Sequence, residues 1–264
     1  DLTFRGGADV TGLSVALAPG IENVTLDGAM DADATGNDAA NAIVGGAGAN
    51  ALAGGLGDDA LTGGAGDDAI DGGDDFDAAI YAGNRADFTV TTVAGADGRV
   101  TGFTAIVDDN AIDGDEGADA LTSIERIEFA DAVLDTALPV QVFDAFGALV
   151  GTFATIQEGV DAAPVDGVVN VAAGILSGNV LIDKPLTLVG ANAGVSGLDA
   201  ARAPSRDGGG LIASAAAGET VIDGIVTVTA DGVTIDGVVV DTSGLGGGAT
   251  AVALQGAGAT FANS

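Results

Sequence analysis

A nine-residue pattern repeats five times without interruption between residues 36 and 80. Each frame begins with glycine, carries Asp or Asn at its sixth position and, in four of the five frames, Ile or Leu at its eighth. The sixth-position residues are Asn41, Asn50, Asp59, Asp68 and Asp77, and the eighth-position residues are Ile43, Leu52, Leu61, Ile70 and Ala79. Glycine supplies the positive φ angles of tight turns, and one inward apolar residue suits a very short strand. The pattern therefore predicts, in every frame, a turn of six residues and a strand of three.

Two such frames make one flattened coil of eighteen residues, so turns two frames apart should stack on the same edge. Stacked turns bring side-chain carboxylates and backbone carbonyls together, and Ca²⁺ accepts six to eight such oxygen ligands in a flexible cage. We expect about three calcium ions between these turns. The site shared by Asp59 and Asp77 should be the strongest, because both residues are charged, whereas Asn41 and Asn50 are neutral. The predicted ligand residues are Asn41, Gly45, Asn50, Gly54, Asp58, Asp59, Gly63, Asp67, Asp68, Gly72 and Asp77.

The frames follow the consensus Gly-Gly-x-Gly-x-Asp-x-apolar-x, which residues 63–71 match at every position. In this the segment resembles the RTX, or haemolysin-type calcium-binding, family. The resemblance implies a parallel β-roll that binds calcium, and export by type I secretion. A flexible glycine-rich linker is the alternative, but a linker has no reason to carry Leu or Ile every ninth residue. One large apolar side chain per frame makes a thin core, so we expect the roll to fold and stiffen when calcium binds.

Composition limits the partners. The chain carries 39 acidic and 7 basic residues, a formal charge of −32, which repels nucleic acids and anionic membranes. It contains no Cys and no His, which removes thiolate chemistry and the commonest general base. No apolar run reaches the length of a transmembrane helix, so we expect no membrane insertion. The charge points to a calcium-rich or saline setting, and the resemblance to the RTX family implies a secreted or cell-surface protein.

The rest of the chain divides into a β lead-in over 1–35, a β capping region over 81–139 and a second β region over 140–264, with the roll at 36–80. We expect no nonapeptide in 81–139, where the strands should be Phe88–Val93, Phe103–Val107 and Ile124–Phe129. An acidic loop in this region is interpreted first as a solvated loop and second as a further calcium site. Its residues are Asp113, Asp115, Glu116 and Asp119.

Residues 150–264 carry closely spaced strand-like runs after a helix-capping box at Thr155–Glu158. The box predicts a short helix from about Ile156 to Ala163. With the runs Val169–Gly174 and Asn179–Gly190, this region resembles the start of right-handed parallel β-helices of the pectin-lyase-like superfamily. No C-terminal cap is evident, so we expect a truncated β-helix. The predicted fold class is thus all-β: a parallel β-roll, a small β cap and the start of a β-helix.

Two functions remain open. The first is a calcium-binding structural or adhesive module of a large secreted RTX surface protein, such as an adhesin or surface-layer protein, whose partners are further copies or polysaccharide. The second is a fragment of a secreted polysaccharide lyase or mannuronan epimerase with its catalytic residues outside this chain. The candidate bases, Lys184 and Tyr81, fit better as a solvated turn residue and a packing residue. We therefore assign no catalytic residue and favour a non-enzymatic role.

Overall fold

The computed structural model describes residues 1–5, 12–29, 31–110, 116–191, 193, 218–241 and 252–262. The chain is nearly all β, with mostly parallel pairing, as its repeats predict. It forms two compact units, Asp1–Ala137 and Leu138–Ser264. The finer division into four segments stays a prediction.

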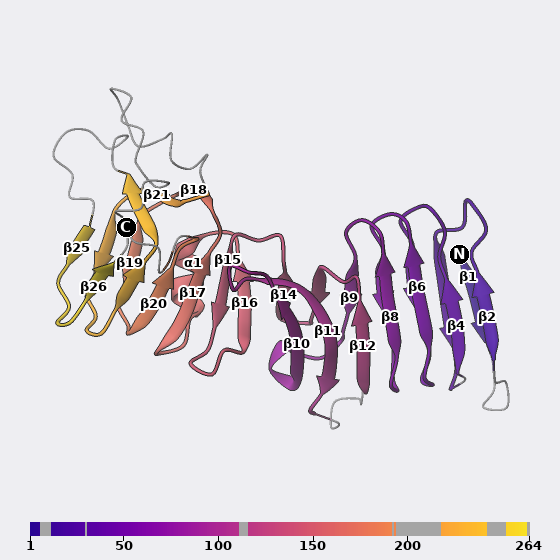
Figure 1. Cartoon of the computed structure of the whole chain (residues 1–264). Helices are drawn as coiled ribbons and strands as arrows, with labels where there is room; N and C mark the ends of the chain where they lie inside the picture. The colour runs from indigo at the N-terminus through magenta and orange to yellow at the C-terminus, as the bar shows by residue number, and fades with distance from the viewer. Residues whose placement is uncertain are drawn as a thin grey trace. The chain divides into compact units, whose positions relative to one another are not determined.

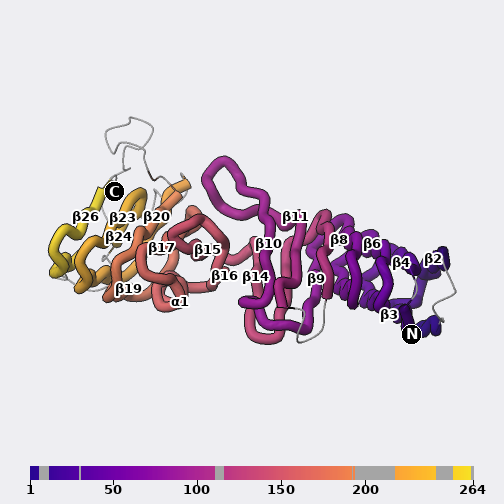
Figure 2. The backbone as a smooth tube through the Cα atoms, turned by 90° about the horizontal axis from the view of Figure 1, so that it is seen from below, coloured from indigo at the N-terminus to yellow at the C-terminus, as the bar shows by residue number. Residues whose placement is uncertain are grey.

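The first unit is a roll of two seven-stranded sheets (Figure 1). One sheet contains, in order, β1 (Leu2–Arg5), β3 (Asn23–Asp27), β5 (Ala42–Val44), β7 (Ala60–Thr62), β9 (Ala78–Ile80), β13 (Arg126–Glu128) and β14 (Val133–Asp135). The other contains β10 (Phe88–Ala94), β11 (Val100–Asp108), β12 (Ala118–Thr122), β8 (Ala69–Gly73), β6 (Ala51–Gly55), β4 (Ala32–Thr35) and β2 (Leu13–Ala16). Successive repeat strands alternate between the two sheets, so the chain coils, and Figure 2 shows these coils stacked.

The coil period is the predicted eighteen residues. Ala42 pairs with Ala60, and Ala60 pairs with Ala78. In the facing sheet, Ala51 pairs with Ala69. The eighth-position side chains point into the space between the sheets and are at most 2 % exposed, which gives the roll one buried apolar residue per strand.

The roll does not stop at Ile80, and the expectation that residues 81–139 hold no repeat frame is wrong. After the antiparallel hairpin β10–β11, strand β12 pairs in parallel with β8, and β13 pairs in parallel with β9. Leu121 aligns with Ile70, and Ile127 aligns with Ala79. The chain thus leaves the roll after β9, makes an insertion and returns to add one more coil.

The second unit winds round three sheets. The first is β16 (Leu149–Phe153), β15 (Val140–Phe143), β17 (Gly167–Val171), β20 (Leu186–Val189), β23 (Thr234–Asp236) and β26 (Thr260–Ala262). The second is β18 (Gly174–Ser177), β21 (Thr220–Asp223) and β24 (Val238–Asp241), and the third is β19 (Val180–Ile182), β22 (Val226–Val228) and β25 (Val252–Leu254). This is the coil topology expected of a parallel β-helix, and its hand and its kinship to pectin-lyase-like proteins stay predictions.

The predicted short helix is present as α1 (Ile156–Ala162), with the capping box between Thr155 and Glu158 formed in both directions. Its Gln157 side chain accepts a hydrogen bond from the Leu181 N–H at 2.7 Å and donates one to the Leu181 carbonyl at 3.3 Å. The amide therefore imitates a neighbouring strand and covers the free edge of β19.

Candidate metal centre

The sixth residue of every repeat frame is buried at the edge of the roll. Asn41, Asn50, Asp59, Asp68 and Asp77 are between 0 % and 3 % exposed. Each backbone N–H donates to a side-chain oxygen of the equivalent residue one coil later, for example Asn41 N to Asp59 Oδ1 at 2.7 Å and Asp59 N to Asp77 Oδ1 at 2.8 Å. The same bond joins Asn50 to Asp68 at 2.7 Å. Two columns of side chains thus run along the roll, one on each edge, as the eighteen-residue period predicts.

Three carboxylate oxygens in these columns have no hydrogen-bond partner. They are Oδ2 of Asp59, Asp68 and Asp77, all fully buried atoms. A buried carboxylate oxygen without a donor costs at least as much as a lost hydrogen bond, and normally it finds a proton, a cationic side chain or a metal ion. These three atoms therefore point to a cation in the folded roll.

The first-position glycines show what surrounds two of these oxygens. A Cβ built on Gly54 would collide with both Asp59 Oδ2 and the Gly72 carbonyl oxygen of the next coil. On Gly72, it would collide with the Ser123 carbonyl oxygen and lie 2.5 Å from Asp77 Oδ2. A carboxylate oxygen and a backbone carbonyl oxygen thus converge on the same space. Two acceptors with no donor between them suit Ca²⁺, which takes oxygen ligands of both kinds.

The two asparagine turns bring a side-chain oxygen and a carbonyl oxygen together beside the first glycine in the same way, but their side-chain oxygen has a donor. Asn41 Oδ1 accepts from the Asn37 N–H at 2.7 Å, and Asn50 Oδ1 accepts from the Gly46 N–H at 2.8 Å. The Asn50 amide also donates to the Ala32 carbonyl at 2.7 Å. The turn-facing oxygen is therefore paired within the protein in both asparagine frames, whereas in the aspartate frames the corresponding oxygen is unpaired.

Backbone conformation explains this difference. The second-position glycines of the three aspartate frames, Gly55, Gly64 and Gly73, have φ of 118°, 103° and 108°. Asn37 and Gly46, at the same position of the asparagine frames, lie outside the positive-φ region. The N–H of the second residue donates to the sixth side chain in both asparagine turns, whereas in the aspartate turns, where that residue has positive φ, Oδ2 receives no donor.

Burial makes the aspartates hard to ionise in the metal-free protein. Desolvation raises the pKa of Asp68 to about 6, against the hydrogen bond from Asn50 that lowers it. The pKa of Asp77 also rises to about 6, first through burial and then through the nearby charges of Asp59 and Glu125. The pKa of Asp59 is raised by burial as well. A bound cation would favour the ionised form at all three positions.

The remaining predicted ligands occupy two kinds of position. Gly45, Gly54, Gly63 and Gly72 are buried at the first position of their frames, next to the sixth-position side chains. Asp58 and Asp67 are exposed, and their carboxylates accept from the N–H groups of Phe76 at 3.2 Å and Ala118 at 3.0 Å. The metal-binding role of all these residues stays a prediction.

The structure also brings in residues that the tandem pattern does not include. Asp119 is 3 % exposed and accepts from the Asp68 N–H at 2.8 Å, so it extends one column as a sixth-position residue would. Its other oxygen accepts from the Tyr81 hydroxyl at 2.8 Å, and burial raises the pKa of Asp119 to about 7. On the opposite edge, Glu125 Oε2 accepts from the Asp77 N–H at 3.1 Å.

A signal for Asp119 was present in the sequence. Residues 114–122 read Gly-Asp-Glu-Gly-Ala-Asp-Ala-Leu-Thr, which has glycine first and fourth, Asp sixth and Leu eighth. Of the predicted acidic loop, Glu116 accepts from the N–H groups of Ala82 and Gly83 at 3.0 and 3.2 Å. Asp113 and Asp115 lie outside the described residues.

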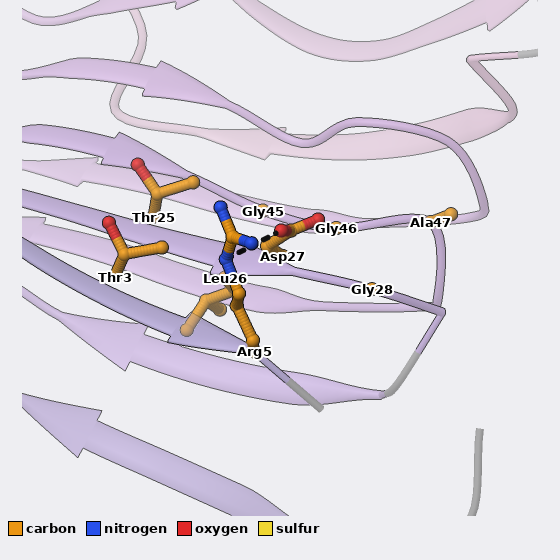
Figure 3. Close-up of a pocket in the computed structure, with 9 residues that line it drawn as sticks. All are labelled: Thr3, Arg5, Thr25, Leu26, Asp27, Gly28, Gly45, Gly46 and Ala47. Carbon is orange, nitrogen blue, oxygen red and sulfur yellow. Dashed lines mark ion pairs between the residues drawn. The ribbon is translucent and has the colours of Figure 1, made fainter. Parts of the chain in front are cut away.

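Within the described ranges, no three acidic side chains converge closely enough to hold a metal by themselves. Any ion in the roll therefore needs backbone carbonyls as well. A surface groove near the N-terminus is a weaker candidate for a binding site (Figure 3). Its ion pair joins Arg5 Nε to Asp27 Oδ2 at 3.3 Å, with the Arg5 side chain 80 % and the Asp27 side chain 55 % exposed. Ion pairs this exposed contribute little to stability.

Comparison with known families identifies the repeats. Residues 35–70 and 44–78 match the model of the RTX calcium-binding nonapeptide repeat, a model of four copies. The segment is thus made of RTX repeats, as its sequence pattern predicts. Neither the curated proteins nor the solved structures gave a significant match.

Proposed function

We propose that this chain, whose roll is built from RTX calcium-binding repeats, is a structural or adhesive module of a secreted surface protein that folds and stiffens when Ca²⁺ binds. The observation that carries the proposal is the set of three buried, unpartnered carboxylate oxygens at Asp59, Asp68 and Asp77. Each marks the position of one ion. Without cations, the folded roll must bury these three groups either as unpaired charges or as protonated acids.

The asparagine turns support the same assignment. At Asn41 and Asn50, backbone donors already pair with the side-chain oxygens, so these two turns close without an ion. Calcium dependence is therefore concentrated in the later coils, from Gly54 onward. This refines the sequence-based expectation, in which the asparagine turns form weaker calcium sites.

The overall charge supports a setting rich in cations. A chain with a formal charge of −32 repels itself unless cations neutralise part of that charge. RTX repeat proteins are typically secreted, and in the described part of the chain no helix is long and apolar enough to cross a membrane. Stacked coils extend along one direction, which suits a spacer or scaffold.

Both candidate bases, Lys184 and Tyr81, make hydrogen bonds within the protein. Lys184 Nζ donates to the Asp161 carbonyl at 2.7 Å, at the end of α1. Tyr81 is 4 % exposed and bonds Asp119, and burial raises its pKa, so its hydroxyl holds its proton more firmly. Neither residue is placed to remove a proton from a polysaccharide, and a structural role remains the better proposal.

The test is a calcium titration of the whole chain followed by chelation. Tyr81 is the only tyrosine and the chain has no tryptophan, so intrinsic fluorescence reports on the first unit alone. We expect Ca²⁺, but not Mg²⁺ at equal concentration, to change the fluorescence and increase the β signal in circular dichroism, because Mg²⁺ requires a tighter octahedral site. The proposal fails if fluorescence and circular dichroism are the same with calcium and with chelator.

A further inference from the structure

The last repeat turn packs against a segment that belongs to no repeat. Residues 123–125 connect β12 to β13 and lie over the turn that begins at Gly72. This connection has three residues, whereas the turn it covers, residues 72–77, has six. We propose that a calcium ion joins the two, held by Asp77, the Ser123 carbonyl and Glu125. The inference rests on the proposed calcium binding and assigns one of the ions to a site that two nonapeptides do not form.

Asp77 supplies the first ligand. Its side chain is 0 % exposed, and Oδ2 has no partner, whereas Oδ1 is bonded to the Asp59 N–H. The unpartnered oxygen faces the first-position glycine of its own frame, Gly72, as Asp59 Oδ2 faces Gly54. Asp77 thus presents a free carboxylate oxygen beside Gly72, although no further tandem repeat follows.

Ser123 takes the place of the missing glycine. Its carbonyl oxygen reaches the space beside Gly72 that a Cβ would fill, as the Gly72 carbonyl does beside Gly54. Ser123 has φ of 49°, in the left-handed region, whereas the first-position glycines Gly54 and Gly72 lie outside it, so the carbonyl is presented by a different backbone conformation. A serine held in this conformation presents its carbonyl where a repeat would present one.

Glu125 takes the place of the missing sixth residue. Its Oε2 accepts from the Asp77 N–H at 3.1 Å, as Asp77 Oδ1 accepts from the Asp59 N–H one coil earlier. Glutamate is one methylene longer than aspartate, which compensates for the shorter connection. The result is a second carboxylate that contacts Asp77 through its backbone N–H, and a cation bound by both side chains would offset their mutual repulsion.

The opposite edge shows that such an ion is not needed everywhere. There Asp119 is the last carboxylate of its column, and its Oδ2 accepts a hydrogen bond from the Tyr81 hydroxyl at 2.8 Å. One edge of the roll is therefore closed by a tyrosine, and the other has two carboxylates and a carbonyl. An ion at the second edge ties residues 123–128 to the repeats and fixes the base of the insertion that starts after Ile80.

The test compares Glu125→Gln with Glu128→Gln in the full chain. Glutamine can still accept from the Asp77 N–H, so the first variant removes the charge and keeps the fold. Glu128 lies on the strand that follows the same connection, is half-buried and pairs with Arg126 at 3.0 Å, which makes it the control with the same change in charge. Bound calcium is counted by native mass spectrometry, and amide exchange of residues 123–128 is measured with calcium and with chelator.

We expect Glu125→Gln to bind one ion fewer than the parent, or to bind it at least tenfold more weakly, and to lose the calcium-dependent protection of residues 123–128. Asp77→Asn should do the same, and Glu128→Gln should match the parent. The proposal is overturned if Glu125→Gln binds as many ions with the same affinity and keeps that protection. If the parent itself binds no calcium, the proposed function fails as well, so the parent measurement separates the two failures.

Discussion

Replacing Asp59 by asparagine should stabilise the metal-free roll and destabilise the calcium-loaded one. The new side chain can accept from the Asn41 N–H through its oxygen, as Asp59 does at 2.7 Å. Its amide nitrogen then lies where the unpartnered Oδ2 was, beside the Gly72 carbonyl, and can donate to it. The substitution thus exchanges a cation requirement for an internal hydrogen bond.

The two effects have opposite signs and similar size. Removing a buried, unpartnered carboxylate oxygen should raise the free energy of unfolding of the metal-free protein by about 1–3 kcal/mol. Losing one ion should lower it by about 2.7 kcal/mol when free calcium is about a hundred times the dissociation constant, and by about 4.1 kcal/mol at about a thousand times. At about a thousand times the dissociation constant the loss exceeds the gain, so the order of stability of parent and variant should reverse between chelator and this calcium concentration.

The assay follows Tyr81 fluorescence, which reports on the first unit alone. In chelator, trimethylamine oxide is titrated to drive folding, so stability can be compared even if the parent is unfolded without calcium. In calcium, urea is used to unfold both proteins. Asp71→Asn is the matched control, because Asp71 is an exposed strand residue and the change in charge is the same.

We expect Asp59→Asn to fold at a lower trimethylamine oxide concentration than the parent and to unfold at a lower urea concentration in calcium, while Asp71→Asn follows the parent in both. The reasoning is refuted if Asp59→Asn is less stable than the parent in chelator, or equally stable in calcium. The first result would mean that the unpartnered oxygen does not destabilise the metal-free roll, and the second would mean that it is not a cation ligand.

Three further predictions concern other contacts. In chelator, the first unit should lose stability as pH rises from about 4 to about 7. The pKa values of Asp68 and Asp119 in the folded protein, about 6 and about 7, exceed the ordinary 3.8, so the folded state binds more protons than the unfolded state over this range. Urea midpoints measured at several pH values test this. Tyr81→Phe should lower the free energy of unfolding by about 1–3 kcal/mol, read by thermal melting, without changing the number of bound ions, because it leaves Asp119 without its donor. Gln157→Ala should speed exchange of the Leu181 amide at least tenfold, because its acceptor is lost.

The period of the roll could be predicted from sequence because glycine, Asp or Asn, and Leu or Ile recur at fixed spacing. That spacing determines which residues stack, and the pairing of Ala42 with Ala60 follows it. The capping box at Thr155 likewise predicts helix α1, because both of its hydrogen bonds are local. The fixed repeat spacing and the local hydrogen bonds of the capping box are therefore enough to predict this part of the fold.

The return of the roll after its insertion was not found from tandem spacing. The frame at residues 114–122 fits the pattern, but 33 residues, 81–113, separate it from the fifth frame. Glu125 could not be identified at all, because it replaces a sixth-position residue after a turn of a different length. Such a substitution becomes visible only when the Asp77 N–H is seen to bond it.

The weaker calcium sites expected at the asparagine frames stay a prediction, and the structure adds a conformational difference that the sequence did not indicate. The charge of the sixth residue suggested weaker sites at Asn41 and Asn50. The φ angle of the second residue, positive at Gly55 but not at Gly46, decides whether a backbone donor reaches that side chain. Glycine is compatible with both conformations, so its presence in the sequence does not distinguish them.

The most direct test of the account is a crystal structure of the chain grown with calcium, with anomalous scattering used to locate the metal. The account predicts anomalous peaks within coordination distance of Oδ2 of Asp59, Asp68 and Asp77, and none in the turns of Asn41 and Asn50. Ordered aspartate turns without a peak, or peaks of equal strength in the asparagine turns, would contradict it.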